Sequence, residues 1–325
     1  MTTQKRKTAL ITGITGQDGA YLARLLVDKN YSVTGTTRSD NPNLSGLRHL
    51  DILDKIAVEK CDLTNQDAAL RIIQKYNPHE VYNLTGQSSV GLSFKEPSLT
   101  AISNILPTLN LLEAIRTTDK NIRFYQASSS DMFGKAEKLP VREESPFRPI
   151  SPYAVSKVSA HLITVSYREA FGLFSVSGIM FNHESYLREN NFFIKKIIRE
   201  SLAILHGEQD VLRVGDVNVK RDFGFAPEYV RAMWLMLQKN TPEDFLICSG
   251  KSILLRDIIE YVFKKFNIPI EKLIEDKKLF RPADILDMYG DNTKARQKLD
   301  WHYDMDFFEA LDMIIAEEVK MREAK

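Results

Sequence analysis

The chain of 325 residues has few of the features that mark several large classes of protein. It contains two cysteines, Cys61 and Cys248, too few for a disulfide framework or a cysteine metal cluster, and we expect both to be buried. The formal net charge is +1, whereas nucleic-acid and membrane-surface binders need a clear basic excess. No apolar run reaches the roughly 18 residues of a membrane span, and the run at 8–12 is too short for a signal peptide. We therefore expect a cytoplasmic protein with no metal, nucleic-acid or membrane partner.

A glycine-rich turn stands between the first predicted strand, 8–12, and the first predicted helix, 20–29. Gly13 permits a tight turn, Gly16 lets backbone approach a pyrophosphate, and Gly19 lets the helix pack close to the strand. The free N–H groups at the helix N-terminus suit phosphate. A glycine turn without a ligand is the alternative, and the strand–turn–helix context favours dinucleotide binding.

The residues that follow the second and third predicted strands, 31–36 and 56–60, indicate which dinucleotide is bound. An NAD site usually has an acidic residue after the second strand, whereas an arginine suits the 2′-phosphate of NADP. Arg38 stands there, with Arg48 as a second candidate, and predicts NADP; a solvated surface charge is the alternative. Asp62 follows the third strand and is placed either to bind adenine or to cap a helix.

Polar residues follow two further predicted strands, 80–84 and 122–127. The carboxyl ends of parallel strands form the ligand crevice of an open α/β sheet. Ser129 and Asp131 lie after the second of these strands, and we favour a catalytic role over a simple capped turn.

Tyr153 and Lys157 open a helix-periodic segment, 154–171. Side chains four residues apart share one face of a helix. An ammonium beside a phenol favours the phenolate and lowers the phenol pKa from about 10 towards neutrality. Such a pair can move a hydroxyl proton while a hydride leaves the same carbon. Alone the pair is more often an ordinary helix face, but the preceding strand ends favour catalysis.

The alternation of strands and helices predicts an α/β fold, a Rossmann-type doubly wound parallel sheet. The regular alternation of strands and helices ends after a sixth strand, 174–181, which predicts a smaller, mostly helical C-terminal lobe. We divide the chain into a Rossmann domain at 1–182 and a mainly substrate-binding lobe at 183–325, with some strands returning to the main sheet. In the lobe we expect helices at about 191–206 and 227–238, the second opened by residues 220–224.

Together these residues resemble the extended short-chain dehydrogenase/reductase superfamily, and within it the GDP-mannose 4,6-dehydratase family. The resemblance covers nearly the whole chain. Its motifs are Thr12-Gly-Ile-Thr-Gly-Gln-Asp-Gly-Ala-Tyr-Leu22, Glu80-Val-Tyr-Asn-Leu84, Phe124-Tyr-Gln-Ala-Ser128, Ser151-Pro-Tyr-Ala-Val155, Phe181-Asn-His-Glu-Ser185, Lys220-Arg-Asp222 and Ala232-Met-Trp-Leu-Met-Leu237.

The resemblance implies NADP that is reduced and reoxidised within one cycle, a GDP-sugar held across two lobes, and a homodimer or homotetramer. The implied cofactor residues are Gly13, Thr15, Gly16, Gln17, Asp18, Gly19, Arg38, Asp62, Leu63, Leu84, Tyr153, Lys157, His183 and Arg188. The implied substrate residues are Gln87, Ser88, Asn182, Lys196, Leu212, Lys220, Arg221, Arg281 and Asp284. We expect Lys220, Arg221 and Arg281 to grip a diphosphate.

The implied reaction produces a 4-keto-6-deoxy sugar. The Tyr153 phenolate, held by Lys157, takes the C4 hydroxyl proton, Asp131 moves the C5 proton and protonates the leaving C6 hydroxyl, and Ser129 assists. The family usually has Thr and Glu at 129 and 131. Asp is one methylene shorter, roughly 1.5 Å, and a misplacement of that order costs about 10²-fold in rate unless the site is re-spaced.

The substitutions in Thr85-Gly86-Gln87-Ser88-Ser89, where the family has Ala-Ala-Gln-Ser-Phe, indicate a sugar bulkier than mannose, such as GDP-N-acetylglucosamine or a GDP-heptose. Two rival functions stay open beside the dehydratase. One is a GDP-sugar C4 dehydrogenase or reductase without elimination; the other is a non-catalytic NADP-sensing protein on the same fold.

Overall fold

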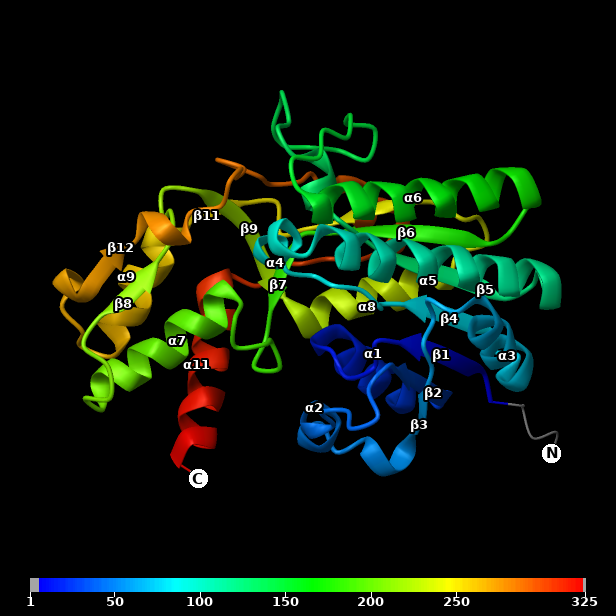
Figure 1. Ribbon diagram of the computed structural model, residues 1–325, viewed down its shortest axis with the longest axis horizontal. Coiled ribbons are helices and arrows are strands. Elements are labelled where there is room, and N and C mark those ends of the chain that lie inside the picture. Colours follow the sequence, from blue (N-terminus) through cyan, green and yellow to red (C-terminus); the bar gives the residue numbers. More distant parts are fainter. Residues whose placement is uncertain (1–5, 324–325) are drawn as a thin grey trace.

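The computed structural model describes residues 6–323, which contain a seven-stranded parallel sheet in the order β10-β6-β5-β4-β1-β2-β3 (Figure 1). The sheet confirms the predicted Rossmann-type α/β fold. Its strands are β1 (Thr8–Thr12), β2 (Ser32–Thr37), β3 (Ala57–Lys60), β4 (Glu80–Asn83), β5 (Arg123–Ser129), β6 (Ser175–Met180) and β10 (Phe245–Ile247).

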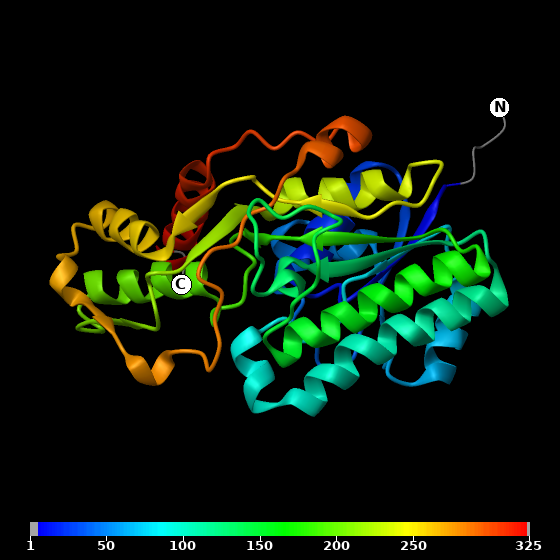
Figure 2. The same cartoon turned by 90° about the horizontal axis from the view of Figure 1, so that it is seen from above.

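Helices cover both faces of this sheet. The helices of this part of the chain are α1 (Gln17–Asp28), α2 (Ser45–His49), α3 (Gln66–Tyr76), α4 (Val90–Lys95), α5 (Pro97–Thr118), α6 (Pro152–Phe171), α8 (Ala226–Leu237) and α10 (Thr293–Leu299). Figure 2 shows α5 and α6 side by side on one face, with α8 on the other. Successive strand residues point to opposite faces. In β5, accordingly, Phe124 enters the core under α3 and α5, and Tyr125 enters the core under α1 and α8.

The second lobe lies at the left of Figure 1 and has its own core, which includes Ile197, Ile258 and Leu311. Its helices are α7 (Phe193–Leu205), α9 (Leu255–Lys265) and α11 (Phe307–Glu323). A three-stranded sheet contains β7 (Asn182–Glu184), β9 (Lys220–Phe225) and β11 (Ser252–Leu254), and a two-stranded sheet contains β8 (Leu212–Val214) and β12 (Leu273–Glu275). Within residues 6–323, no helix combines the length and apolar character needed to cross a membrane.

One element prediction in this lobe is wrong: residues 220–224 do not open a helix. They form β9, which pairs in parallel with β7 and antiparallel with β11, and α8 begins only at Ala226. β11 pairs with residues 220–222 and β7 with residues 223–225, while Lys220 N and Asp222 N donate to Leu286 O and Met288 O. Such tertiary pairing overrides local preference.

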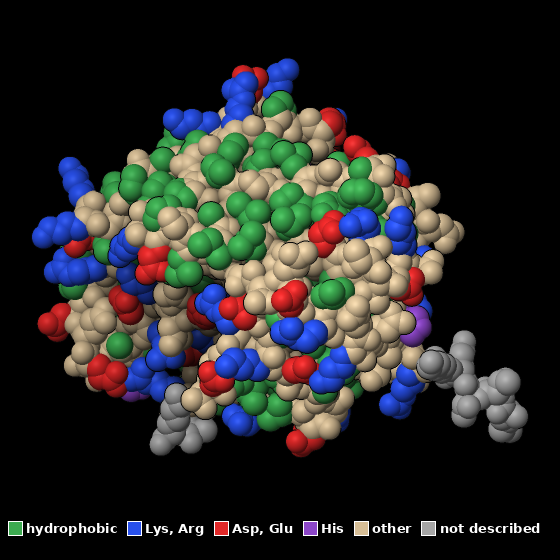
Figure 3. All heavy atoms as spheres, turned by 45° about the vertical axis from the view of Figure 1, so that its right-hand side comes forward, with side chains coloured by type: hydrophobic (Ala, Val, Ile, Leu, Met, Phe, Trp, Pro, Cys, Tyr) green, Lys and Arg blue, Asp and Glu red, His purple; other side chains and the backbone are tan. Residues whose placement is uncertain are grey.

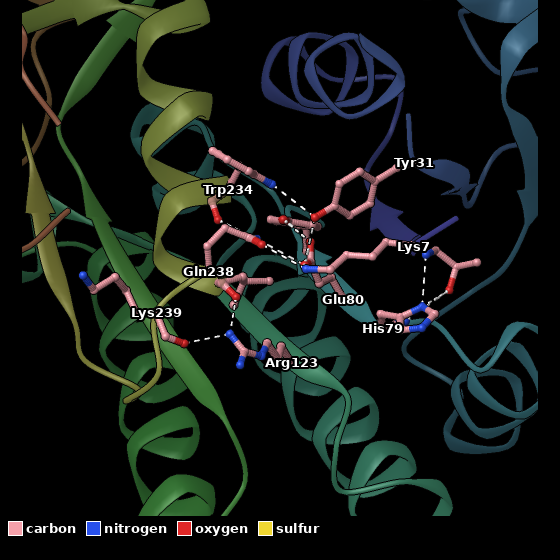
Figure 4. A network of polar contacts seen from close by, with 11 residues as sticks. Lys7, Tyr31, His79, Glu80, Arg123, Trp234, Gln238 and Lys239 are labelled. Carbon is pink, nitrogen blue, oxygen red and sulfur yellow. Dashed lines mark hydrogen bonds and ion pairs between the residues drawn. The ribbon is translucent and has the colours of Figure 1, made fainter. Parts of the chain in front are cut away.

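A polar network joins the sheet to α8 at the amino ends of the strands, away from the site described below (Figure 4). The Glu80 carboxylate, 1% exposed, accepts hydrogen bonds from Tyr31 Oη at 3.1 Å, Tyr82 Oη at 2.8 Å and Gln238 Nε2 at 3.1 Å. Lys7 Nζ lies 3.3 Å from the same carboxylate and supplies the opposite charge. A buried carboxylate needs such partners, so this network anchors α8 to β4.

Candidate active site

A cavity of about 800 Å³ runs along the carboxyl ends of the central strands and continues into the second lobe. Every residue predicted to bind the cofactor lines it: Gly13, Thr15, Gly16, Gln17, Asp18, Gly19, Arg38, Asp62, Leu63, Leu84, Tyr153, Lys157, His183 and Arg188. Ser129, Asp131, Gln87, Ser88, Asn182, Arg221, Arg281 and Asp284 line it as well. The fold therefore brings residues from about 270 positions of sequence to one continuous cleft.

The glycine-rich turn forms one end of this cavity and leaves backbone N–H groups open to it. Gly13 has φ +68°, and a Cβ there would lie 3.0 Å from the Leu84 carbonyl oxygen. A Cβ at Gly19 would lie 2.5 Å from Gly13 O, so α1 packs against the turn as expected. The α1 N-cap is Gly16, which has no side chain to occupy the first N–H groups. This cradle fits a pyrophosphate.

Beyond β2 and β3 lies the part of the cavity suited to an adenosine. Arg38 is exposed there and makes no hydrogen bond or ion pair with another residue in the range 6–323. Asp62 accepts hydrogen bonds from Thr64 Oγ1 at 2.8 Å and Thr64 N at 3.0 Å, and these bonds with the Arg38 charge lower its pKa. The helix that follows is capped by Asn65, not by Asp62. Arg48 does not line the cavity.

The two cysteines differ in burial. Cys248 is buried, as expected, but Cys61 is partly exposed and lines the cavity beside Asp62. The prediction of burial for Cys61 is therefore wrong, because β3 is the edge strand of the sheet and its carboxyl end opens into the cleft.

Tyr153 and Lys157 lie in the first two turns of α6, whose N-terminus is capped by Ser151 Oγ accepting from Ala154 N at 3.1 Å. Both side chains are buried and reach the same cavity. Lys157 Nζ donates to Ala127 O at 2.9 Å and lies 5.8 Å from the centroid of the Tyr153 ring. Burial lowers the pKa of Lys157 to about 8.

The expected acidification of the phenol is wrong for the protein by itself. Burial raises the pKa of Tyr153, and the Asp131 charge raises it further, while a hydrogen bond with Ser129 and the Arg188 charge act in the opposite direction. Lys157 is not among the groups that lower it, and its ammonium donates to the Ala127 carbonyl on β5. A cation brought into the cavity by a ligand would therefore be needed to favour the phenolate.

Ser129 and Asp131 lie at the carboxyl end of β5, where the chain enters a short 3-10 turn, Ser130–Phe133. Ser129 Oγ accepts from Asp131 N at 3.2 Å and fixes this turn. Burial raises the pKa of Asp131, although the charges of Arg221 and Arg281 oppose the shift. A carboxyl whose pKa moves towards neutrality can both accept and return a proton near pH 7.

Two arginines from the second lobe complete the cavity. Arg221 on β9 donates from Nη2 to Asp284 Oδ1 at 2.6 Å and from Nη1 to Ile285 O at 2.6 Å. Arg281 lies 3.4 Å from the same carboxylate oxygen. Asp284 therefore holds two guanidinium groups at one wall, an arrangement that suits a diphosphate.

Three predicted substrate residues do not reach the cavity. Leu212 is fully buried in the core of the lobe, because it stands on the inner face of β8. Lys196 Nζ donates to Arg213 O at 2.6 Å, which holds its side chain against β8. Lys220 is exposed beside Arg221, since neighbouring residues of a strand point to opposite sides.

Gly86 does not enlarge the cavity in the way the sequence indicated. It has φ +150°, and a Cβ there would lie 2.4 Å from Asn104 Oδ1. Asn104 Oδ1 accepts from Gln87 N at 2.7 Å, and its Nδ2 donates to Ser156 Oγ at 2.8 Å. The missing methyl group therefore makes room for an internal amide, whereas Ser89 does line the cavity.

Sequence reasoning missed Glu184, which lines the cavity with a side chain that is only 4% exposed. Its Oε2 lies 3.6 Å from Arg188 Nε, and neither atom has a hydrogen-bond partner among the described residues. Burial raises the pKa of Glu184, opposed by the charges of Arg188 and His183. The only available signal was its position at the end of a strand, next to His183.

A family model described as GDP-mannose 4,6 dehydratase matches residues 10–314. The chain is 41% identical over 325 residues to the GDP-mannose 4,6-dehydratase of Sinorhizobium fredii, covering 92% of this chain and 93% of that protein. It is 38% identical over 343 residues to the GDP-mannose 4,6 dehydratase of Homo sapiens, covering 97% and 92%.

Solved structures share the fold. The dTDP-glucose 4,6-dehydratase of Streptomyces venezuelae, solved with NAD, has a TM-score of 0.88 at 19% identity, covering 97% of this chain and 98% of that chain. The UDP-glucose 4-epimerase of Thermotoga maritima, solved with UDP-glucose, has a TM-score of 0.86 at 23% identity, covering 97% and 99%.

Proposed function

Because the chain belongs to the GDP-mannose 4,6-dehydratase family, whose members are hydro-lyases, we propose that it converts a GDP-hexose to a GDP-4-keto-6-deoxyhexose for deoxysugar and surface-glycan biosynthesis. One observation carries the proposal: Tyr153, Lys157 and Asp131 line the same cavity as the glycine-rich turn and the paired arginines Arg221 and Arg281.

We propose NADP as the cofactor. The turn from Gly13 to Gly19 would hold its pyrophosphate, and Arg38 would hold the 2′-phosphate. Arg38 supports this choice because it is exposed in the cavity and makes no hydrogen bond or ion pair with residues 6–323. When bound, NADP supplies the acceptance of a hydride from the sugar and its return.

Tyr153 would take the proton from the C4 hydroxyl through its phenol oxygen. Since burial raises its pKa, the phenolate needs more positive charge than the protein supplies, which an oxidised nicotinamide would add to that of the Lys157 ammonium. Hydrogen bonding to Ser129 favours the ionised phenol further.

Asp131 would remove the proton from C5 and donate a proton to the C6 hydroxyl, which leaves as water. Its raised pKa supports this double role, because a shift towards neutrality brings the acidic and basic forms of the carboxyl closer to equal population near pH 7. Arg221 and Arg281 would bind the diphosphate and so hold the sugar beside Asp131.

We propose that the sugar is bulkier than mannose. The proposed substrate is GDP-N-acetylglucosamine or a GDP-heptose. The support for a bulkier sugar is Ser89, a small residue lining the cavity where the family usually has Phe.

We also propose a homodimer or homotetramer and keep the division into units at 1–182 and 183–325. Figure 3 shows hydrophobic side chains gathered on one face, and α5 and α6 expose the apolar residues Leu99, Ile102, Val155, Leu162 and Phe171.

The proposal is tested by incubating the purified protein, without added cofactor, with a panel of GDP-, UDP-, CDP- and dTDP-sugars and analysing products by mass spectrometry. Loss of one water from a GDP-sugar is expected. If GDP-sugars are consumed only when NADP or NADPH is added, and no water is lost, the protein is instead a GDP-sugar C4 dehydrogenase or reductase. The short Asp131 side chain is what favours that alternative.

A further inference from the structure

The imidazole of His183 has an oxygen acceptor at each nitrogen. Nδ1 lies 2.6 Å from the Phe181 carbonyl oxygen, and Nε2 lies 2.9 Å from Asp18 Oδ2. A neutral imidazole has one N–H donor, so it can satisfy only one of the two. The ring is 8% exposed and stacks on Tyr229 with centroids 4.9 Å apart, which prevents it from turning away.

Asp18 stands in the first turn of α1, directly after the glycine-rich turn. A carboxylate there is favourable for the helix dipole but repels a pyrophosphate bound at the same N-terminus. Gln17 Nε2 donates to Asp18 Oδ1 at 3.1 Å and to His183 O at 3.0 Å, so the first turn of α1 is joined to β7.

We propose that His183 is a positioning residue that carries two protons, neutralises Asp18 beside the dinucleotide, and makes retention of the dinucleotide dependent on that proton. The inference rests on the proposed NADP site. The imidazolium donates to both acceptors at once and offsets the negative charge of Asp18.

The charged groups around His183 act in both directions, since Arg188 opposes its protonation and Asp18 favours it. They are Asp18 on α1, Glu184 beside it on β7 and Arg188 from the loop that follows, while Tyr229 on α8 covers the ring. Burial acts to lower the pKa of His183, but the Asp18 charge and hydrogen bond outweigh it, so the pKa is raised. The pKa of Asp18 is lowered: burial acts to raise it, and the His183 charge and hydrogen bond prevail.

The test is a double-mutant cycle on the affinity for NADP, measured by isothermal titration after removal of bound dinucleotide. His183→Gln removes the positive charge that is hydrogen-bonded to Asp18, while the Arg188 charge stays, and is expected to weaken NADP binding about 30-fold. Adding Asp18→Asn should restore affinity to within about threefold of wild type, because no unpaired charge is left. His161→Gln, a buried histidine outside the cavity, is the matched control and should leave affinity unchanged.

The dependence on pH gives a second readout. Wild-type affinity should fall as the pH rises through the His183 pKa, and the double variant should lack this component. Lys157 titrates in every variant, so the contribution of His183 is the difference between the affinity–pH profiles of the wild type and the double variant.

Failure of Asp18→Asn to rescue His183→Gln would show that the histidine acts by packing and would overturn the inference. If His183→Gln does not fold, the double variant must fold and bind NADP for the inference to stand. A wild-type protein that binds no NADP would overturn the proposed function itself, which is a different result.

Discussion

Replacing Asp131 by Asn should separate oxidation of the sugar from elimination. The amide is isosteric but cannot accept the C5 proton, so formation of the dehydrated product is expected to fall about 10³-fold, the usual contribution of a positioned acid/base. Backbone geometry should be kept, because the turn is fixed by Asp131 N donating to Ser129 Oγ at 3.2 Å rather than by the carboxylate.

The same change should make C4 oxidation easier at lower pH. The Asp131 charge raises the pKa of Tyr153, so its removal lowers that pKa and moves the pH dependence of hydride uptake downward. Single-turnover measurements of nicotinamide absorbance follow the oxidation, and mass spectrometry of the same samples follows loss of water.

Asp131→Glu decides whether this site is built for the shorter side chain. In a re-spaced site the extra methylene displaces the carboxylate and costs up to about 10²-fold in elimination, whereas in an unadjusted site it raises the rate. Elimination by Asp131→Asn at the wild-type rate would refute the assignment, and so would a variant that neither oxidises nor dehydrates yet binds the GDP-sugar normally.

Three further outcomes are expected. Because burial lowers the pKa of Lys157 to about 8, turnover at saturating GDP-sugar should decline above that pH as the ammonium is lost. Lys157→Arg should move this decline to higher pH. Constant turnover up to about pH 10 would contradict the prediction. Arg221→Lys should raise KM for the GDP-sugar about tenfold with little change in kcat, whereas Lys220→Gln, one residue away but outside the cavity, should change neither. Glu80→Gln should lower the free energy of unfolding in urea by about 2 kcal/mol without altering kcat, since it disturbs four contacts of a buried carboxylate far from the cleft.

Local sequence patterns were sufficient to predict elements whose functional residues lie close together in the chain. The strand, glycine turn and helix at 8–28 are specified by an apolar run and glycine spacing, and they form as predicted. Tyr153 and Lys157 share a helix face because of their four-residue spacing, which no distant contact alters.

Predictions failed where a distant segment supplies the partner. Residues 220–224 form a strand because β7 and β11 pair with it, and Leu212 belongs to a core assembled from α7, α9 and α11. The space beside Gly86 is filled by Asn104, a residue on the neighbouring helix α5. No local pattern contains these contacts.

The amino-acid sequence by itself determined the α/β fold, the glycine-rich turn and the Tyr–Lys pair, because each depends on spacing within one element or between neighbouring ones. Only the tertiary structure decided the charge states in the cleft. Burial raises the pKa of the Tyr153 phenol, a backbone carbonyl on β5 binds the Lys157 ammonium, and Asp18 meets His183 across 165 positions of chain. Such electrostatic effects depend on distance and desolvation in space, which sequence separation does not reveal.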